Sequence, residues 1–403
     1  MHRISILSNN KLLLLISFLT VVFFLFAFFV AKKEVIFADG VGYFSYPYEL
    51  LLNKDLSYSS QNSQFFFGVI KTDQYNYNKY PIGTGILLIP ALLLGEVANT
   101  VVGITDHSIY NRNYQFLVGI VGIFYFIAGM ALLKRILRHF YKDKVVNWTI
   151  LTIAFCTNLF IYASTDASFS HIYSFFAINL FVLYLIKWSK KTDYRNTLYL
   201  GFALGLVGLI RPFNLLVVIL FLFIPIDKQS LNIASNIKLL LRSKKMLTVI
   251  LAITLLTMFP QFLYWWSITG NFVIYSYTGE TFNLLSPQIF NVLFSSRGVL
   301  FWHPVLMISF LGIFFLRKKY SNLSSGILVF TLVNIYLISS WWFWDFGIGF
   351  GHRGFTDSLG IMAIPLGAIL QKAEHSSLAS ILLVLLCIGI IANLVQAINY
   401  IYK

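Results

Sequence analysis

Long apolar runs, separated by short clusters of basic residues, constrain this chain more than any other feature of its sequence. A helix needs about 20 mainly apolar residues to cross a bilayer, and residues 12–30 (LLLLISFLTVVFFLFAFFV) form such a run. Only 11% of the residues are charged and 58% are hydrophobic, whereas soluble domains carry about 25% charged residues. The sequence therefore predicts an all-α polytopic membrane protein.

The basic clusters predict the topology, because Lys and Arg gather in cytoplasmic loops. Segment 84–103 is apolar, but Pro90 and Glu96 make it a poor span, and if it crossed the membrane the cluster KRILRHFYKDK (134–144) would face outside. We therefore interpret it as a juxtamembrane or re-entrant helix in the first outer loop, with the N-terminus of the chain in the cytoplasm. About eleven transmembrane helices remain, at 12–30, 114–133, 145–163, 172–188, 197–210, 213–226, 246–266, 299–316, 324–342, 359–371 and 377–397.

This topology predicts a single transmembrane domain over residues 1–403, with long extracytoplasmic loops at 31–113, 267–298 and 341–358. Gly, Tyr and charged residues concentrate in these loops, which suggests a functional site at the outer membrane face. A transporter more often places its polar residues at mid-bilayer within internal repeats, and the helix pattern shows no repeat. The net charge of +15 is spread between apolar runs, so we expect a lipid bilayer and no nucleic acid as a partner.

The first outer loop contains three candidate residues. Asp39 lies in FADGVGYF, where flanking glycines allow close approach of a ligand, and we predict it to be a catalytic carboxylate. A turn Asp that binds nearby backbone N–H groups is the alternative. Lys79 and Tyr80 precede a Pro-Gly turn in NKYPIGTG and are candidate substrate-binding residues, although Lys79 is also compatible with an ordinary snorkelling cation.

Asp166 and His171 lie in a short outer turn, STDASFSHIYSFF, between two expected spans. They can bind a metal, orient an acceptor or contact a phosphate, and Asp166 is a second candidate catalytic residue. The alternative is helix N-capping, which suits the Ser residues of this turn better than His171. A divalent metal held by Asp39, Asp166 and His171 stays open, because no ligand spacing specifies one.

Five cationic or imidazole side chains at the outer side are candidates for binding a donor phosphate. Arg211 interrupts two apolar runs in LIRPFN, where an arginine is a functional candidate, since guanidinium matches phosphate oxygens bidentately. Arg297 and His303 lie in SSRGVLFWHP, and His352 and Arg353 lie in WWFWDFGIGFGHRGFTD. The Trp residues alone are typical of membrane-interface anchors.

These motifs, in this order, resemble the GT-C superfamily of integral-membrane glycosyltransferases, in the bacterial branch related to protein mannosyltransferases and the lipid A aminoarabinose transferase. The resemblance extends from ADGVGYFSYP through KYPIGTGILLIPALLLGE to WWFWDFGIGFGHRGFTD, about residues 12–370. It implies that Asp39 is the general base or orients the acceptor, and that Asp166 occupies the second acidic position. The family often has two adjacent acids in the first loop, whereas here Gly40 follows Asp39.

The resemblance predicts a glycosyltransferase in the bacterial plasma membrane. Its donor would be a polyprenyl-phosphate-linked hexose or pentose, and its acceptor a glycan, a lipid or a protein outside the membrane. Direct attack without a covalent intermediate would invert the anomeric carbon. A polyprenyl-linked glycan or lipid transporter and a non-catalytic scaffold are the alternatives, neither of which needs Asp39 to be a carboxylate.

Overall fold

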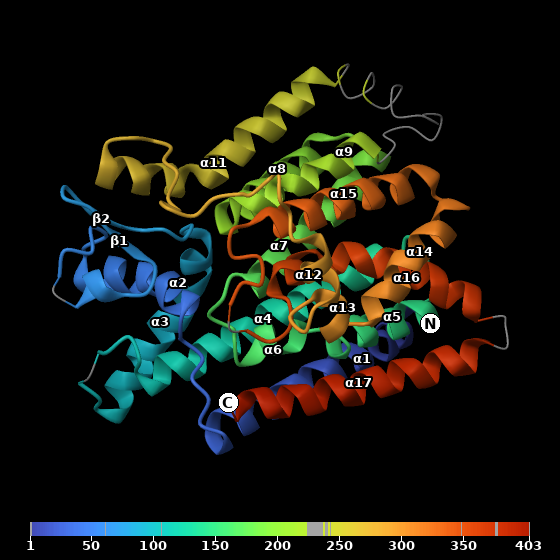
Figure 1. Cartoon of the computed structure of the whole chain (residues 1–403), viewed down its shortest axis with the longest axis horizontal. Helices are drawn as coiled ribbons and strands as arrows, with labels where there is room; N and C mark the ends of the chain where they lie inside the picture. The colour runs from blue at the N-terminus through green and yellow to red at the C-terminus, as the bar shows by residue number, and fades with distance from the viewer. Residues whose placement is uncertain are drawn as a thin grey trace.

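Helices make up nearly the whole fold, which confirms the all-α polytopic class. The computed structural model describes residues 2–402 except 61, 106, 224–236, 238–240, 242, 348 and 375–377. The long helices form a bundle in which the N-terminus and the C-terminus lie at opposite ends (Figure 1). The bundle contains α1 (His2–Leu25), α4 (Arg112–Leu137), α5 (Asp143–Phe155), α7 (His171–Lys190), α8 (Tyr194–Ile210), α11 (Lys244–Thr269), α14 (Val305–Arg317), α15 (Ser321–Ser340), α16 (Leu359–Ala373) and α17 (Leu378–Ile401).

Shorter elements connect these helices. They are α6 (Leu159–Ser164), α9 (Ile219–Phe223), α12 (Ile289–Phe294), α13 (Val299–Trp302), π-helical turns at Phe26–Val30 and Glu49–Asn53, and 3-10 turns at Ser63–Phe65, Pro212–Val218 and Arg353–Ser358. Polar caps and glycines mark several helix ends. The Asn111 side chain accepts from the Asn113 N–H at the start of α4, and Gly270 adopts φ +73° after α11.

The number of helices that are long and apolar enough to cross a membrane differs from the number of apolar runs in the sequence. In the described part of the chain, eight helices are long and apolar enough to cross a membrane, and a ninth span results if α14 is joined to the preceding helical stretch Ile289–Trp302, from which it bends by 97°. The expected span 145–163 is divided into α5 and α6, and 213–226 begins as a 3-10 turn and ends in residues outside the described ones. The count of eleven therefore stays a prediction.

The elements of the first long loop gather at one end of the bundle, which we call the α2 end. Helix α2 (Asp39–Tyr48) lies there beside a two-stranded antiparallel sheet, in which β1 (Val69–Lys71) pairs with β2 (Asn76–Asn78) (Figure 1). Helix α3 (Gly83–Val102) lies at the same end: Gly83 approaches the carbonyl of Leu209 near the end of α8, and Gly95 contacts Tyr114 at the start of α4. Helix α3 is long and apolar enough to span a membrane, so its juxtamembrane or re-entrant placement stays a prediction.

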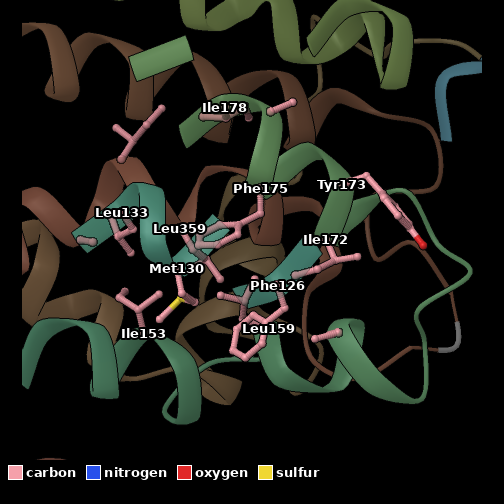
Figure 2. Close-up of a cluster of buried hydrophobic side chains, with 14 of the residues drawn as sticks. Phe126, Met130, Leu133, Ile153, Leu159, Ile172, Tyr173, Phe175, Ile178 and Leu359 are labelled. Atoms are coloured by element: carbon pink, nitrogen blue, oxygen red, sulfur yellow. The ribbon is translucent and has the colours of Figure 1, made fainter. Parts of the chain in front are cut away.

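The core lies where α4, α5, α6, α7 and α16 meet. Figure 2 shows apolar side chains from these five helices, most of them directed toward one another and Tyr173 directed away, and all of those labelled are at most 1% exposed. Close packing of this kind fixes the relative positions of the helices, because changes of even one methylene are felt in a protein interior. The labelled members are Phe126, Met130, Leu133, Ile153, Leu159, Ile172, Tyr173, Phe175, Ile178 and Leu359.

Replacing Gly312 with Ala is expected to destabilise the bundle by about 1–3 kcal/mol, because the two helices α14 and α16 touch at this residue. A Cβ on Gly312 would lie 2.0 Å from the carbonyl oxygen of Pro365. Gly389→Ala is the matched control, since its Cβ would meet only Cys156 Sγ, at 3.4 Å. The thermal unfolding midpoints of the two variants are compared in one detergent. Equal midpoints would contradict close packing of α14 against α16 at Gly312.

Candidate functional site

The backbone around Asp39 is arranged to present its carboxylate at the start of α2. Ala38 has φ +43°, a region that costs a non-glycine residue about 1–3 kcal/mol and that clusters at functional sites. Gly40 packs against the turn before α7, and a Cβ there would lie 1.8 Å from Ser168 Oγ. The second acid that the GT-C family often has after the first one therefore has no room at position 40.

Both carboxylate oxygens of Asp39 have a partner. Arg353 Nη1 lies 2.9 Å from Oδ2, and the Tyr80 hydroxyl donates to Oδ1 at 2.8 Å. The side chain of Asp39 is 21% exposed and that of Arg353 is 12% exposed, so both are held in place without being sealed from solvent. Asp39 of the first loop thus contacts both Tyr80 of the same loop and Arg353 of the 341–358 loop, and all three are residues that the sequence predicts for the site.

A second ion pair surrounds Asp357, at the end of the 3-10 turn that begins with Arg353. Its Oδ2 accepts hydrogen bonds from Arg211 Nη1 at 2.9 Å and from Asn214 Nδ2 at 2.8 Å. Its Oδ1 lies 2.7 Å from His171 Nδ1. Asp357 and His171 are buried, whereas Arg211 is 19% exposed and can still reach a ligand.

Tyrosines join the two ion pairs. The Tyr43 and Tyr80 rings lie 4.7 Å apart, and the Tyr80 and Tyr277 rings lie 6.2 Å apart. Burial raises the pKa of Tyr43 to about 12, while the nearby charges of Arg211 and Arg353 lower it. Tyr43 therefore stays a neutral hydroxyl between the two guanidinium groups.

Asp166 has a different environment from Asp39, because its side chain is fully enclosed. Its residue is 1% exposed, and its oxygens accept hydrogen bonds from Tyr400 Oη at 2.8 Å and from Thr165 Oγ1 at 3.0 Å. Burial raises the pKa of Asp166 to about 6, although the bonds from Tyr400 and Thr165 lower it in part. This geometry favours support of the site over direct contact with a substrate, and the catalytic role of Asp166 stays a prediction.

The raised pKa of Asp166 predicts how stability depends on pH. The folded protein binds the proton of the Asp166 carboxyl more tightly than the unfolded chain does. The contribution of this proton to the free energy of unfolding is therefore complete below about pH 4 and is lost as the pH rises through about 6. We expect the free energy of unfolding of the wild type to fall by about 3 kcal/mol over that interval through this residue. In Asp166→Asn this component should vanish, whereas the exposed-residue control Asp73→Asn should retain it. Thermal unfolding in nanodiscs at several pH values measures this pH-dependent component. Identical pH profiles for wild type and Asp166→Asn would contradict the prediction.

The other predicted residues are spread around this centre. Lys79 forms an ion pair with Glu280, and Arg297, whose side chain is 61% exposed, forms one with Asp345. His303 and His352 are buried at 1% and 0% exposure. Burial lowers the pKa of His352 to about 4, so this ring carries no positive charge at neutral pH.

The three candidate metal ligands do not form a common site. Asp39 is bound to Arg353 and Tyr80, Asp166 is enclosed by Tyr400 and Thr165, and His171 faces Asp357. Among the described residues, no group of three or more His, Cys, Asp or Glu side chains is placed to hold a metal ion. The residues present do not fit a metal in this arrangement, and we derive no reaction step through one.

Several residues of the centre were not among the sequence-based candidates. Asn214 lies in the quoted motif LIRPFN, three residues from Arg211, so proximity in sequence could have indicated it. Asp357 lies four residues after Arg353 in GHRGFTD, a motif whose polar residues the sequence does indicate, but its pairing with Arg211 has no local signal. Tyr43 lies one turn after Asp39. Tyr277 and Tyr400 lie in segments with no distinctive motif, and no sequence signal singled them out.

The fold is that of known membrane transferases. The oligosaccharyltransferase of Archaeoglobus fulgidus in its apo form superposes with a TM-score of 0.58 at 11% identity, over 98% of this chain and 56% of that chain. ArnT of Cupriavidus metallidurans, solved bound to undecaprenyl phosphate, superposes with a TM-score of 0.57 at 11% identity, over 88% of this chain and 60% of that chain. The chain has the GT-C fold.

Comparison at the level of sequence finds no relative of this chain. No family model matches it, and no curated protein matches it. A further structure of the Archaeoglobus fulgidus oligosaccharyltransferase, a complex with Zn and sulfate, has a TM-score of 0.51 at 11% identity, over 98% of this chain and 53% of that chain. The chain thus spans little more than half of the length of these solved structures.

Proposed function

We propose that this chain is a glycosyltransferase that moves a hexosyl or pentosyl unit from a polyprenyl-phosphate donor to an extracytoplasmic acceptor. The observation that carries the proposal is the partly exposed Asp39 carboxylate, held by Arg353 and Tyr80 at the α2 end of a GT-C fold. A carboxylate and two arginines within one cluster of tyrosines supply the groups that such a transfer needs.

Asp39 acts in this proposal as the general base. An acceptor hydroxyl oxygen bonds to the anomeric carbon of the donor while its proton passes to Asp39. The bond from that carbon to the phosphate oxygen breaks, and polyprenyl phosphate leaves with the electron pair. The sugar passes through an oxocarbenium-like state, and one displacement inverts the anomeric configuration.

Arg353 and Arg211 are proposed to bind the phosphate of the donor. Each keeps a partly exposed side chain, and each has a carboxylate partner when no substrate is bound. Within the described part of the chain, Arg353 Nε is buried and makes no hydrogen bond, so this guanidinium has an unused donor that a bound phosphate oxygen would satisfy. A phosphate that draws Arg353 away from Asp39 would also free Oδ2 of Asp39 to accept the acceptor's proton, which couples donor binding to base catalysis.

The remaining candidates have supporting roles in this proposal. Lys79 and Tyr80 border the sugar, and Arg297 extends the cationic rim. His171 orients Asp357. His303 and His352 are buried, so their proposed contact with a phosphate is a hydrogen bond from a neutral ring.

The solved neighbours support a lipid-phosphate donor. One was solved with undecaprenyl phosphate, and another, the Archaeoglobus fulgidus protein AglB, in complex with an inhibitory peptide and a dolichol-phosphate, at a TM-score of 0.51 and 11% identity over 98% of this chain and 55% of that chain. We propose that the present chain lies in a bacterial plasma membrane, with its N-terminus in the cytoplasm and the α2 end outside. The acceptor is a glycan, a lipid or a protein.

The direct test is sugar transfer in proteoliposomes. Purified wild type is mixed with a panel of radiolabelled polyprenyl-phosphate hexoses and pentoses and with envelope extract as acceptor, with and without EDTA. Transfer of one sugar with inverted configuration supports the proposal, and the EDTA arm decides whether a divalent metal is required. Movement of the donor across the bilayer without transfer would instead identify a transporter.

A further inference from the structure

A pocket lined by tryptophans lies beside the proposed catalytic centre. It has a volume of about 560 Å³, within the range of small-molecule sites, and it lies between the loop after α11 and the end of α15. We call it the tryptophan pocket. Its lining residues are Phe282, Asn283, Leu284, Leu285, Ser286, Gln288, Ser339, Trp341, Trp342 and Trp344.

The lining of the tryptophan pocket combines indole rings with uncharged polar groups. None of its ten residues is ionisable. Ser339 is 1% exposed, and its hydroxyl has no hydrogen-bond partner within the described residues, which is costly unless a ligand or water binds it. The side-chain amide of Asn283 likewise makes no hydrogen bond in the described part of the chain. The exposed Asn283 side chain is accessible to a ligand, and the buried Ser339 hydroxyl has hydrogen-bonding capacity that a bound ligand or water would satisfy.

A chain of ring contacts leads from the tryptophan pocket to Asp39. The Trp341 ring lies 6.0 Å from that of Tyr277, and Tyr277 lies 6.2 Å from Tyr80, whose hydroxyl donates to Asp39. On the same side, Trp342 Nε1 donates to Glu280, the partner of Lys79. A ligand in the pocket would therefore be connected to Asp39 through Tyr277 and Tyr80 without occupying the place of the reacting groups.

We propose that the tryptophan pocket binds a neutral saccharide of the acceptor. Indoles offer flat apolar faces to the C–H faces of a sugar ring, and amide and hydroxyl groups pair with its hydroxyls. A polyprenyl tail would leave Ser339 and Asn283 without partners, and a phosphate or a charged peptide would find no counter-charge in the lining. The assignment of this saccharide as acceptor rests on the proposed function, whereas saccharide binding itself does not.

The test is saccharide binding to the full chain in nanodiscs that contain no maltoside detergent, since that detergent carries a sugar. Neutral trisaccharides of glucose, galactose and mannose are titrated while tryptophan fluorescence and calorimetry are followed. Trp341→Ala is expected to weaken binding of the preferred sugar by about 10- to 30-fold, as expected for a buried aromatic anchor. Trp266→Ala is the matched control, because Trp266 stacks on Phe272 outside the pocket. Asn283→Ala tests the polar contribution with little risk to folding, because Asn283 is exposed.

Each outcome of this test is decisive. No saccharide binding by the wild type, or equal binding by wild type and Trp341→Ala, overturns the proposal. Crosslinking of a photoreactive polyprenyl phosphate to Trp341 or Trp344 overturns it in favour of a lipid. A further result would be a wild type that binds a saccharide through Trp341, with binding retained in Asp39→Asn, and yet transfers no sugar. That result supports the saccharide site and contradicts the proposed transferase activity.

Discussion

Replacing Asp39 with Asn is expected to lower the rate of sugar transfer by about 10²–10⁴-fold, the usual contribution of a general base. Asn keeps the shape of the side chain but cannot accept the acceptor's proton. Its loss of charge also leaves Arg353 without its partner, so donor binding should persist or tighten. The expected result is a large fall in kcat with a donor KM that is unchanged or lower, measured by transfer in proteoliposomes.

The control for Asp39→Asn is Asp73→Asn. Asp73 is an exposed carboxylate in the turn between β1 and β2, so the substitution removes the same charge from the same loop. Its rate should stay within about twofold of the wild type, because surface substitutions away from special features have small effects. Transfer by Asp39→Asn at the wild-type rate would remove Asp39 from catalysis and direct attention to Asp166.

Replacing Asp357 with Asn is expected to have the largest effect on stability, about 3–5 kcal/mol, because it breaks a buried ion pair from one side. Asp357 is 3% exposed and binds Arg211, Asn214 and His171. Without its charge, the guanidinium of Arg211 has no counter-ion at the base of the site. The thermal unfolding midpoint in nanodiscs measures the loss, and donor binding should weaken because Arg211 is no longer held in place.

Asp143→Asn is the matched control for this experiment. Asp143 also pairs with an arginine, Arg138, but their side chains are 54% and 34% exposed. Exposed ion pairs contribute about 0–1 kcal/mol, so the midpoint should hardly change. Similar losses in both variants would mean that Asp357 does not organise the site.

The sequence predicts the part of this architecture that depends on local patterns. The length of the apolar runs predicts the helices, and the side on which the basic clusters fall predicts which loops are cytoplasmic. Polar residues in the remaining loops are then the candidate site residues. Asp39, Tyr80, Arg211 and Arg353 do gather in one region, although their roles stay predictions. Local patterns were sufficient here because each of these residues interrupts an apolar or glycine-rich stretch.

Pairings across the chain could not be predicted in the same way. Arg211 and Asp357 are 146 residues apart, and periodicity within either segment carries no information about the other. The break between α5 and α6 contains Cys156 and Asn158 but no Pro or Gly, so nothing in the apolar run signals it. The exclusion of a side chain at position 40 depends on Ser168, which only tertiary packing brings there.

The hydrogen bond from Tyr400 to Asp166 has a consequence for biosynthesis. Its two residues are 234 positions apart, and Tyr400 also packs on Phe350 beside the Arg353 turn. A chain still emerging from the ribosome holds Asp166 for most of its synthesis without this partner, because α17 is made after the other helices of the bundle. Of the two hydrogen bonds to the Asp166 carboxylate, the bond from Thr165 can form early, whereas the bond from Tyr400 must wait until α17 has been made and inserted.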